Sequence, residues 1–196
     1  MNHWRLIVLE FVEPIRDRKK INDMKKYLQG NKRDYLFFVL GINSALRVSD
    51  LLELKFEDLI NEKLTPLEHI KLKETKTGKH NKIAISNGVK KAIVSYVQDF
   101  YKGNLEDYVF YSRKGQNKPI QRAMAWKIIK SAAEAIGIKD IGTHSLRKTW
   151  AYHSYKAGTD IVIIQDMLNH SSPAITLRYI GITQDEKDRA ILSLDL

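Results

Sequence analysis

The sequence predicts a mainly α-helical domain with one small antiparallel β-sheet. Apolar residues recur at helical spacing over most of the chain, and strict alternation of apolar and basic residues is confined to residues 68–85. An apolar fraction of 43% in 196 residues is enough for one folded domain with a substantial core. No internal repeat and no low-complexity linker divides the chain.

The first third of the chain predicts helices. Residues 21–28 carry apolar side chains at helical spacing and are followed by Gly30, a stop signal. The next apolar stripe includes Leu36 and Leu46, so we expect one longer helix there. Residues 51–54 predict a further helical turn.

The spacing changes between residues 68 and 85. Apolar and basic residues alternate on both sides of Gly78. Two alternating runs joined by residues 77–81 are typical of an antiparallel hairpin with one buried and one basic face.

Five helices are predicted after the hairpin. Their expected positions are from Ser86 to Gly103, 121–136, 143–157, from Thr159 or Asp160 through Leu168, and from Ser172 onward. Pro173 favours the last start, because proline at the first helical position lacks only an amide that would be unpaired there. In the second of these helices we expect Met124, Ile128, Ala132 and Ile136 on one side. Residues 108–111 predict a short strand or an extended turn.

The composition excludes several classes of protein. The absence of cysteine excludes disulfides, thiolate nucleophiles and cysteine-type zinc sites. Residues 4–12 are too short, and too interrupted by Arg5 and Glu10, for a secretory signal, and no run reaches the roughly 20 apolar residues of a membrane span. We therefore expect a cytoplasmic protein without a membrane partner. The formal charge of +10 favours nucleic acid as the partner.

Five polar residues are candidates for a phosphate-binding centre. Arg47 lies between two apolar groups, where its side chain enters a cleft or pairs with Asp50 at the surface. His144 and Arg147 are three residues apart on a predicted helix and share one face. His170 in a turn and Tyr179 in the following helix complete the set, although each also fits an ordinary structural role.

These residues lie in motifs that resemble the tyrosine recombinases, the phage integrase family. The motifs are Ala45–Leu51, Lys76–Lys79 in the hairpin, Thr143–Arg147 and Leu168–Ser172, with Tyr179 nine residues after His170. They follow the family's order from about Asn31 to Gly181. The resemblance implies the tyrosine recombinase catalytic-domain fold.

The resemblance also implies a role for each matching residue. Tyr179 would attack a DNA phosphate and form a 3′-phosphotyrosyl bond, with His144 as proton acceptor. The donors to the phosphate would be Arg47, Arg147 and His170. Lys76 would protonate the leaving 5′-oxygen, and Lys79 is a rival for this role because hairpin registers slip easily.

The chemistry explains why these residue types are needed. Phosphodiester cleavage places negative charge on the phosphate oxygens, and planar guanidinium groups bind them bidentately. A phenol with a pKa of about 10 needs a base or nearby positive charge to attack. The covalent ester conserves bond energy, so the resemblance implies no metal, nucleotide or other cofactor, and the chain has no Walker loop.

The sequence departs from the family in two turns and at its N-terminal end. Ala45 and Asn169 stand where the family often has glycine, and both are small or tolerant of turns. We expect residues 1–30 to lead into a catalytic domain at 31–181, followed by a tail at 182–196 that docks in cis or on a neighbour. Many members carry a further DNA-encircling domain in front, so the chain is a naturally short member or a part of a longer one.

Further basic residues are expected to line a DNA channel and to bind phosphates without reading sequence. They are Lys71, Lys73, Lys82, Arg113, Lys114, Lys118 and Arg122. The expected function is site-specific recombination of double-stranded DNA, for integration or excision of a mobile element, by a homotetramer that is a monomer or weak oligomer without DNA.

Three alternatives remain open. Residues 160–179 also resemble a helix-turn-helix, as in a non-catalytic DNA-binding protein. A Xer-like resolvase and a type IB topoisomerase-like activity would use the same covalent chemistry.

Overall fold

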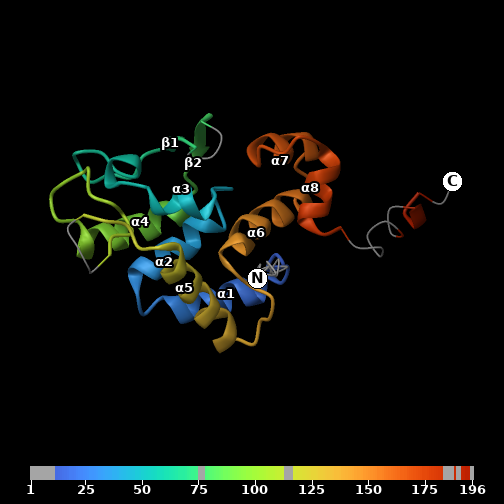
Figure 1. The fold of residues 1–196 in the computed structure, drawn as a ribbon, viewed down its shortest axis with the longest axis horizontal. Coiled ribbons are helices and arrows are strands. Elements are labelled where there is room, and N and C mark those ends of the chain that lie inside the picture. The colour runs from blue at the N-terminus through green and yellow to red at the C-terminus, as the bar shows by residue number, and fades with distance from the viewer. Residues whose placement is uncertain (1–11, 75–77, 113–116, 183–187, 189–190, 195–196) are drawn as a thin grey trace, which may run out of the picture.

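The computed structural model describes residues 12–74, 78–112, 117–182, 188 and 191–194. In chain order its elements are α1 (Arg18–Leu28), α2 (Lys32–Gly41), α3 (Val48–Leu52), the 3₁₀ turn η1 (Phe56–Asp58), β1 (His69–Lys73), β2 (His80–Ala84), α4 (Asn87–Phe100), α5 (Arg122–Ala135), α6 (Thr143–Lys156), α7 (Ile161–Met167) and α8 (Pro173–Ile180). The two strands form an antiparallel hairpin (Figure 1). The predicted fold class is confirmed.

Side-chain caps set most of the helix starts. The residues whose side chains accept a hydrogen bond from a backbone amide of the first turn are Asp17, Asn31, Ser86, Asp160 and Ser172. Three of these caps were expected from the sequence. The helix α6 differs, because Gly142 rather than Thr143 is its N-cap residue and Ser145 Oγ accepts from the Gly142 amide at 3.1 Å.

The long helix expected through Leu46 is wrong, because α2 ends at Gly41. Asn43 Nδ2 donates to the carbonyl of Val39 at 2.8 Å and so caps the end of the helix. Ala45 then adopts a left-handed backbone with φ 57°. This reversal releases Arg47 from a helix side and makes it the residue that leads into α3.

The hairpin has the alternation that the sequence predicts. Ile70 faces Ile83 on its buried side, and Lys71 lies directly opposite Lys82 on the exposed side. The strand β2 begins at His80, inside the expected connection. Like charges directly opposite each other destabilise a sheet, so this face favours a negatively charged partner.

The expectations for α5 and for residues 108–111 are each confirmed in part. Ile128 and Ala132 are buried as expected, but Met124 is exposed and Ile136 is only partly buried. The buried side also includes Ala125, Ile129 and Ala133. The apolar residues of this helix would allow either the expected or the observed side to be buried, and packing against α1 and α3 selects the observed one. Residues 108 and 111 form isolated bridges with Lys55 and Pro119 and belong to no extended strand.

The buried residues form two clusters. The larger cluster takes residues from α1 to α5, the hairpin and the start of α6. The smaller cluster lies among α6, α7 and α8 and contains Ala45, Ala151, Ile164, Leu168 and Ile180. Figure 1 shows α6 running between the two groups. A Cβ on Gly41 would lie 2.5 Å from Cδ1 of Leu146, so glycine allows α2 and α6 to approach closely.

The N-terminal segment holds the end of α8. Ile15 donates its amide to Thr149 Oγ1 at 2.8 Å, and Arg16 Nη2 donates to the carbonyl of Gly181 at 3.0 Å. A cation at the carboxyl end of a helix also complements the helix dipole. Within the described residues, no helix is long and apolar enough to span a membrane.

Candidate active site

Five of the predicted site residues come from separate parts of the fold. Arg47 is the residue before α3, and His144 and Arg147 lie in the first turns of α6. His170 lies in the turn between α7 and α8, and Tyr179 lies in the last turn of α8. Both α7 and α8 pack against α6, and this packing brings His170 and Tyr179 to the helix that carries His144 and Arg147.

Tyr179 lies against two imidazole rings and a lysine. Its Oη is 3.1 Å from Nε2 of His144, and the two rings meet edge to face. The ring of His170 lies 4.9 Å from the ring of Tyr179, centroid to centroid. Lys148 Nζ lies over the ring of Tyr179, 5.3 Å from its centroid. The phenol is therefore held beside a possible proton acceptor.

Arg147 is buried inside the site, with 3% of its surface exposed. Its Nη2 donates to the carbonyl of Leu168 at 2.7 Å, which ties α6 to the end of α7. Its Nη1 is also buried and has no hydrogen-bond partner among the described residues. A buried guanidinium with an unused donor is costly unless an anion completes it.

Arg47 approaches the same centre from the larger cluster. Its Nη1 forms an ion pair with Glu74, whose side chain is 2% exposed. The positive charge of Arg47 acts on His144, Arg147, His170 and Tyr179, so all five predicted residues share one electrostatic environment. The arrangement suits the binding of one anionic group.

The pKa shifts follow from burial and from this positive charge. Burial raises the pKa of Tyr179, against the lowering effect of Arg147 and then Arg47. Desolvation, and after it the charges of Arg147 and Lys148, lower the pKa of His144 to about 4, although the residue keeps an exposed edge. A neutral His144 and a protonated Tyr179 are thus expected at neutral pH.

Arg47 and His170 each follow a turn that contains a residue with left-handed backbone. Ala45 has φ 57° and Asn169 has φ 49°, the two positions at which the sequence departs from the family's glycines. His170 Nδ1 lies 3.0 Å from Oγ1 of Thr176, and Gln165 Nε2 donates to the His170 carbonyl at 3.1 Å. These contacts fix the turn that carries His170.

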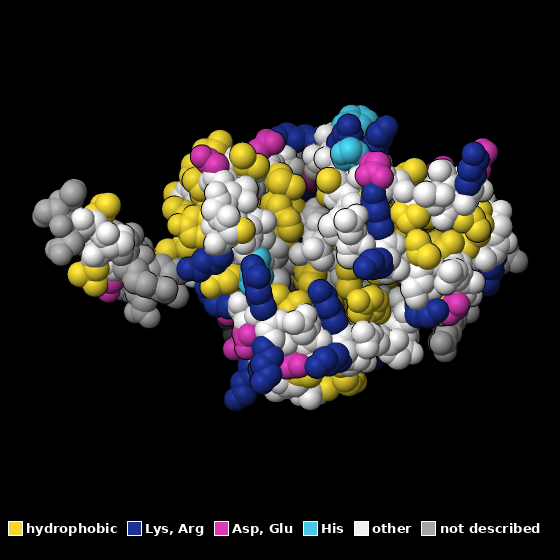
Figure 2. Space-filling model, turned by 180° about the vertical axis from the view of Figure 1, so that it is seen from behind, with side chains coloured by type: hydrophobic (Ala, Val, Ile, Leu, Met, Phe, Trp, Pro, Cys, Tyr) yellow, Lys and Arg dark blue, Asp and Glu magenta, His cyan; other side chains and the backbone are white. Residues whose placement is uncertain are grey.

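Part of the predicted set lies outside the described residues, namely Lys76, Arg113 and Lys114. Lys79 is exposed beside the turn of the hairpin, and its carbonyl accepts from the Glu74 amide at 2.9 Å. The remaining predicted DNA-binding residues are all exposed: Lys71, Lys73, Lys82, Lys118 and Arg122. Figure 2 shows Lys and Arg side chains on both sides of a hollow between the two groups of helices.

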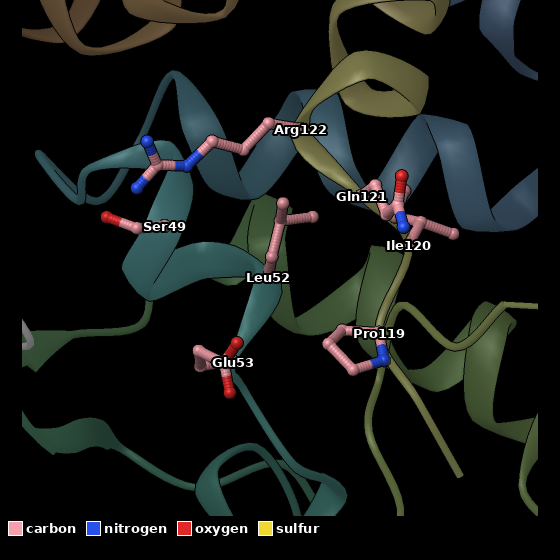
Figure 3. A pocket seen from close by; sticks show the side chains of 7 residues that line it. All are labelled: Ser49, Leu52, Glu53, Pro119, Ile120, Gln121 and Arg122. Carbon is pink, nitrogen blue, oxygen red and sulfur yellow. The ribbon is translucent and has the colours of Figure 1, made fainter. Parts of the chain in front are cut away.

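Arg122 also borders a pocket of about 460 Å³ between α3 and the start of α5. Its side chain extends from α5 toward α3, and the guanidinium lies on the same side of the pocket as Ser49 (Figure 3). Ser49 lies in the first turn of α3, two residues after Arg47, and none of the five predicted catalytic residues that the structure describes lines this pocket. Within the described residues, no group of three or more His, Asp or Glu side chains could hold a metal ion.

Sequence reasoning missed Glu74 and Lys148 as parts of the site. Glu74 is the acidic residue in a hairpin whose exposed face is basic, and this contrast was a usable signal. Lys148 is adjacent to Arg147, and nothing in its spacing distinguishes it from a solvated lysine. Its position over the Tyr179 ring depends on how α8 packs on α6.

Comparison with known proteins supports the same family. The model of the Phage integrase family matches residues 16–186. The probable integrase/recombinase YoeC of Bacillus subtilis is 46% identical over 178 residues, covering 90% of this chain and 93% of the relative. A tyrosine recombinase of Pseudothermotoga lettingae is 30% identical and is covered over 58% of its length, with 89% of this chain aligned.

Solved structures show the same fold. The crystal structure of XerA recombinase has a TM-score of 0.74 at 21% identity, with 93% of this chain and 64% of that chain covered. XerH recombinase bound to its difH substrate has a TM-score of 0.72 at 16% identity, over 92% of this chain and 52% of that one. This chain thus spans little more than half of several relatives. The chain belongs to the phage integrase family of tyrosine recombinases.

Proposed function

We propose that this chain cleaves and rejoins double-stranded DNA at a specific site through a 3′-phosphotyrosyl intermediate on Tyr179. The observation that carries the proposal is the 3.1 Å distance between Tyr179 Oη and His144 Nε2, next to the buried Arg147 with its unused Nη1. A nucleophile beside a base and a preorganised cation is the arrangement that phosphoryl transfer to a hydroxyl needs.

In the proposed cleavage step, one residue accepts the proton of the nucleophile and another supplies a proton to the leaving oxygen. Tyr179 Oη attacks phosphorus, and its proton passes to Nε2 of His144, which is neutral at pH 7 because its pKa is lowered to about 4. The bond between phosphorus and the 5′-oxygen breaks, and Lys76 donates a proton to the departing oxygen. Rejoining runs the same steps backward, with a 5′-hydroxyl as the nucleophile and Tyr179 as the leaving group.

The negative charge on the phosphate is met by three donors. Arg147 offers the buried Nη1, Arg47 offers the nitrogens that do not contact Glu74, and His170 lies beside the Tyr179 ring. Because the surrounding protein is of low dielectric, fixed charges act on the phosphate more strongly than they would in water.

The duplex is proposed to lie along the basic hairpin. Lys71 and Lys82 oppose each other there, and Lys73 opposes His80. Phosphates between these side chains would relieve their repulsion. The proposal is supported by similar solved structures, in which XerH is bound to difH and the Tn1549 integrase is in complex with transposon right end DNA.

The biological event is proposed to be the integration or excision of a mobile element. Two duplexes with two strands each require four nucleophiles, which favours a homotetramer on DNA. In this proposal residues 31–181 carry the chemistry, and the tail at 182–196 docks on its own domain or on a neighbour. The similarity to the probable integrase/recombinase YoeC supports a role in integration or recombination, because this chain covers 93% of that relative's length.

The test uses duplexes nicked near the cleavage position, so that cleavage releases a short strand and traps the covalent product. The duplexes carry the ends of the element that encodes the chain. We expect an SDS-resistant protein–DNA adduct from the wild-type chain and none from Tyr179→Phe. Tyr27→Phe is the matched control, because Tyr27 is exposed on α1 and should leave the adduct unchanged.

The outcomes separate the alternatives. An unchanged adduct from Tyr179→Phe would show that another residue is the nucleophile. Binding without any adduct would favour a non-catalytic DNA-binding protein. Relaxation of supercoiled plasmid without recombinant products would favour an activity of the type IB topoisomerase kind.

A further inference from the structure

Glu74 is a buried carboxylate at the centre of the candidate site. Its Oε2 accepts from Arg47 Nη1, and its Oε1 accepts from Asn81 Nδ2 at 2.7 Å and from Asn169 Nδ2 at 2.9 Å. Its backbone amide donates to the Lys79 carbonyl, and its carbonyl accepts from the Gly78 amide, both at 2.9 Å. Both carboxylate oxygens and both backbone groups are therefore engaged.

These bonds join three distant parts of the chain. Arg47 leads into α3, Asn81 lies on β2, and Asn169 directly precedes His170 in the turn between α7 and α8. Asn169 and Glu74 are 95 residues apart in the sequence. One side chain thus sets where the Arg47 guanidinium, the hairpin and the His170 turn lie relative to one another.

The charge of Glu74 matters as well. Two guanidinium groups in a site of low dielectric repel each other, and a buried carboxylate offsets one of their charges. Within the described residues the Arg47 side chain bonds to Glu74 alone, through Nη1, so its other nitrogens form no further hydrogen bond there. Glu74 therefore offsets one of the two guanidinium charges, and the positive charge that remains on the pair favours an anionic group such as a phosphodiester.

We propose that Glu74 is a positioning residue for strand cleavage. It holds Arg47, the hairpin and the His170 turn in one geometry and does not itself contact DNA. This inference rests on the proposed function, because it names what orients the proposed phosphate donors.

The test compares Glu74→Gln with Glu68→Gln. Glutamine keeps the size of Glu74 and one acceptor oxygen but removes the charge and directs donor hydrogens at its donor neighbours. Glu68 lies just before β1 on the same hairpin, and within the described residues its side chain forms an exposed ion pair with Lys90, so it is the matched control.

The two readouts are duplex affinity and the single-turnover cleavage rate at saturating DNA. We expect Glu74→Gln to lower the rate by about 10- to 100-fold, because small misplacements of catalytic groups have effects of that size. Affinity should stay equal or rise, since a negative charge is removed. Loss of folding would lower both quantities together, and the melting temperature checks it.

Asn169→Gly tests the path through the turn. Glycine fits the left-handed backbone at φ 49° while deleting the amide that Glu74 accepts from. We expect a smaller rate loss from this variant, and the double variant should be no slower than Glu74→Gln alone because the two residues act through one contact. A rate for Glu74→Gln within about twofold of wild type would overturn the proposal.

A DNA-free measurement separates this inference from the proposed function. In an NMR spectrum of the whole chain, Glu74→Gln should shift the side-chain amide of Asn169 and the ring protons of His170, while Glu68→Gln should not. Such shifts with no adduct from the wild-type chain would count against the proposed function and support the geometry. Unchanged signals would overturn the role of Glu74 directly.

Discussion

The two groups of helices differ greatly in how much apolar surface they bury. Among the described residues the larger cluster contains 35 buried side chains, and the smaller cluster contains five. The smaller group also carries two exposed apolar residues on α7, Val162 and Ile163, whose surfaces are 58% and 55% exposed. Yet four of the five predicted site residues that the structure describes come from α6, α7, α8 and the turn between them.

The larger group is thus the rigid support of the site, and the smaller group carries the proposed nucleophile. The larger group carries Arg47 and Glu74 on a well-packed base, whereas Tyr179 lies at the end of a short helix with few buried neighbours. Segments with few buried contacts open locally at lower free energies than the core of a domain. We therefore expect α7 and α8 to adjust when DNA binds while the larger group stays fixed.

The largest expected effect is from Phe37→Ala. Phe37 is fully buried and meets Phe110 edge to face at 5.3 Å between ring centroids. Removing the ring should lower the free energy of unfolding of the larger group by about 3–5 kcal/mol. Urea denaturation followed by circular dichroism measures this. Tyr27→Ala on the exposed face of α1 is the control, and an equal loss there would contradict the assignment of the core.

A smaller and more local effect is expected from Ile164→Ala. Ile164 is fully buried in the smaller cluster, so the change should lower the stability of α7 and α8 by about 2–4 kcal/mol. Amide hydrogen exchange should accelerate there while α2 and α4 keep their protection. The neighbouring Ile163→Ala, on an exposed position, should change little. Equal acceleration throughout the protein would show that the two groups unfold as one unit.

The third prediction concerns the titration of His144. Its pKa is lowered from 6.5 to about 4, so the folded state resists protonation more than the unfolded state does. The contribution to stability is complete above pH 6.5 and is lost as the pH falls toward 4. In an NMR titration without DNA the ring should stay neutral to about pH 5.

Lys148→Met removes one of the positive charges that act on His144, so it should raise the titration midpoint of the ring. A wild-type midpoint at the ordinary histidine value would contradict the proposed electrostatics.

The smallest expected effect is a gain in stability from Ala45→Gly. Ala45 has φ 57°, a left-handed conformation that is unfavourable for any residue with a Cβ. Glycine relieves this strain but loses more chain entropy on folding, so the net gain should be about 0.5–1 kcal/mol. Thermal unfolding measures it. A loss of stability would mean that the buried methyl group of Ala45 contributes more to the smaller cluster than the strain costs.

Local sequence signals predicted most elements and failed where several local structures were possible. Ser86, Asp160 and Ser172 began helices because their side chains satisfy amides of the first turn, a contact within three residues. The helix end at Gly41 was missed because the apolar spacing continues to Leu46. Only the capping bond of Asn43 and the reversal at Ala45 end it.

For the candidate site, too, some features follow from the sequence and others depend on tertiary packing. The sequence by itself determined which residue types are present, their order and the positive charge that favours a phosphate. Only the tertiary structure decided that Tyr179 meets His144, that Arg147 is buried with an unused nitrogen, and that Glu74 joins Arg47 to the turn of Asn169. Apolar spacing indicates which face of a helix is buried but not which other segment covers it, so contacts between residues 27 to 95 positions apart are fixed by packing alone.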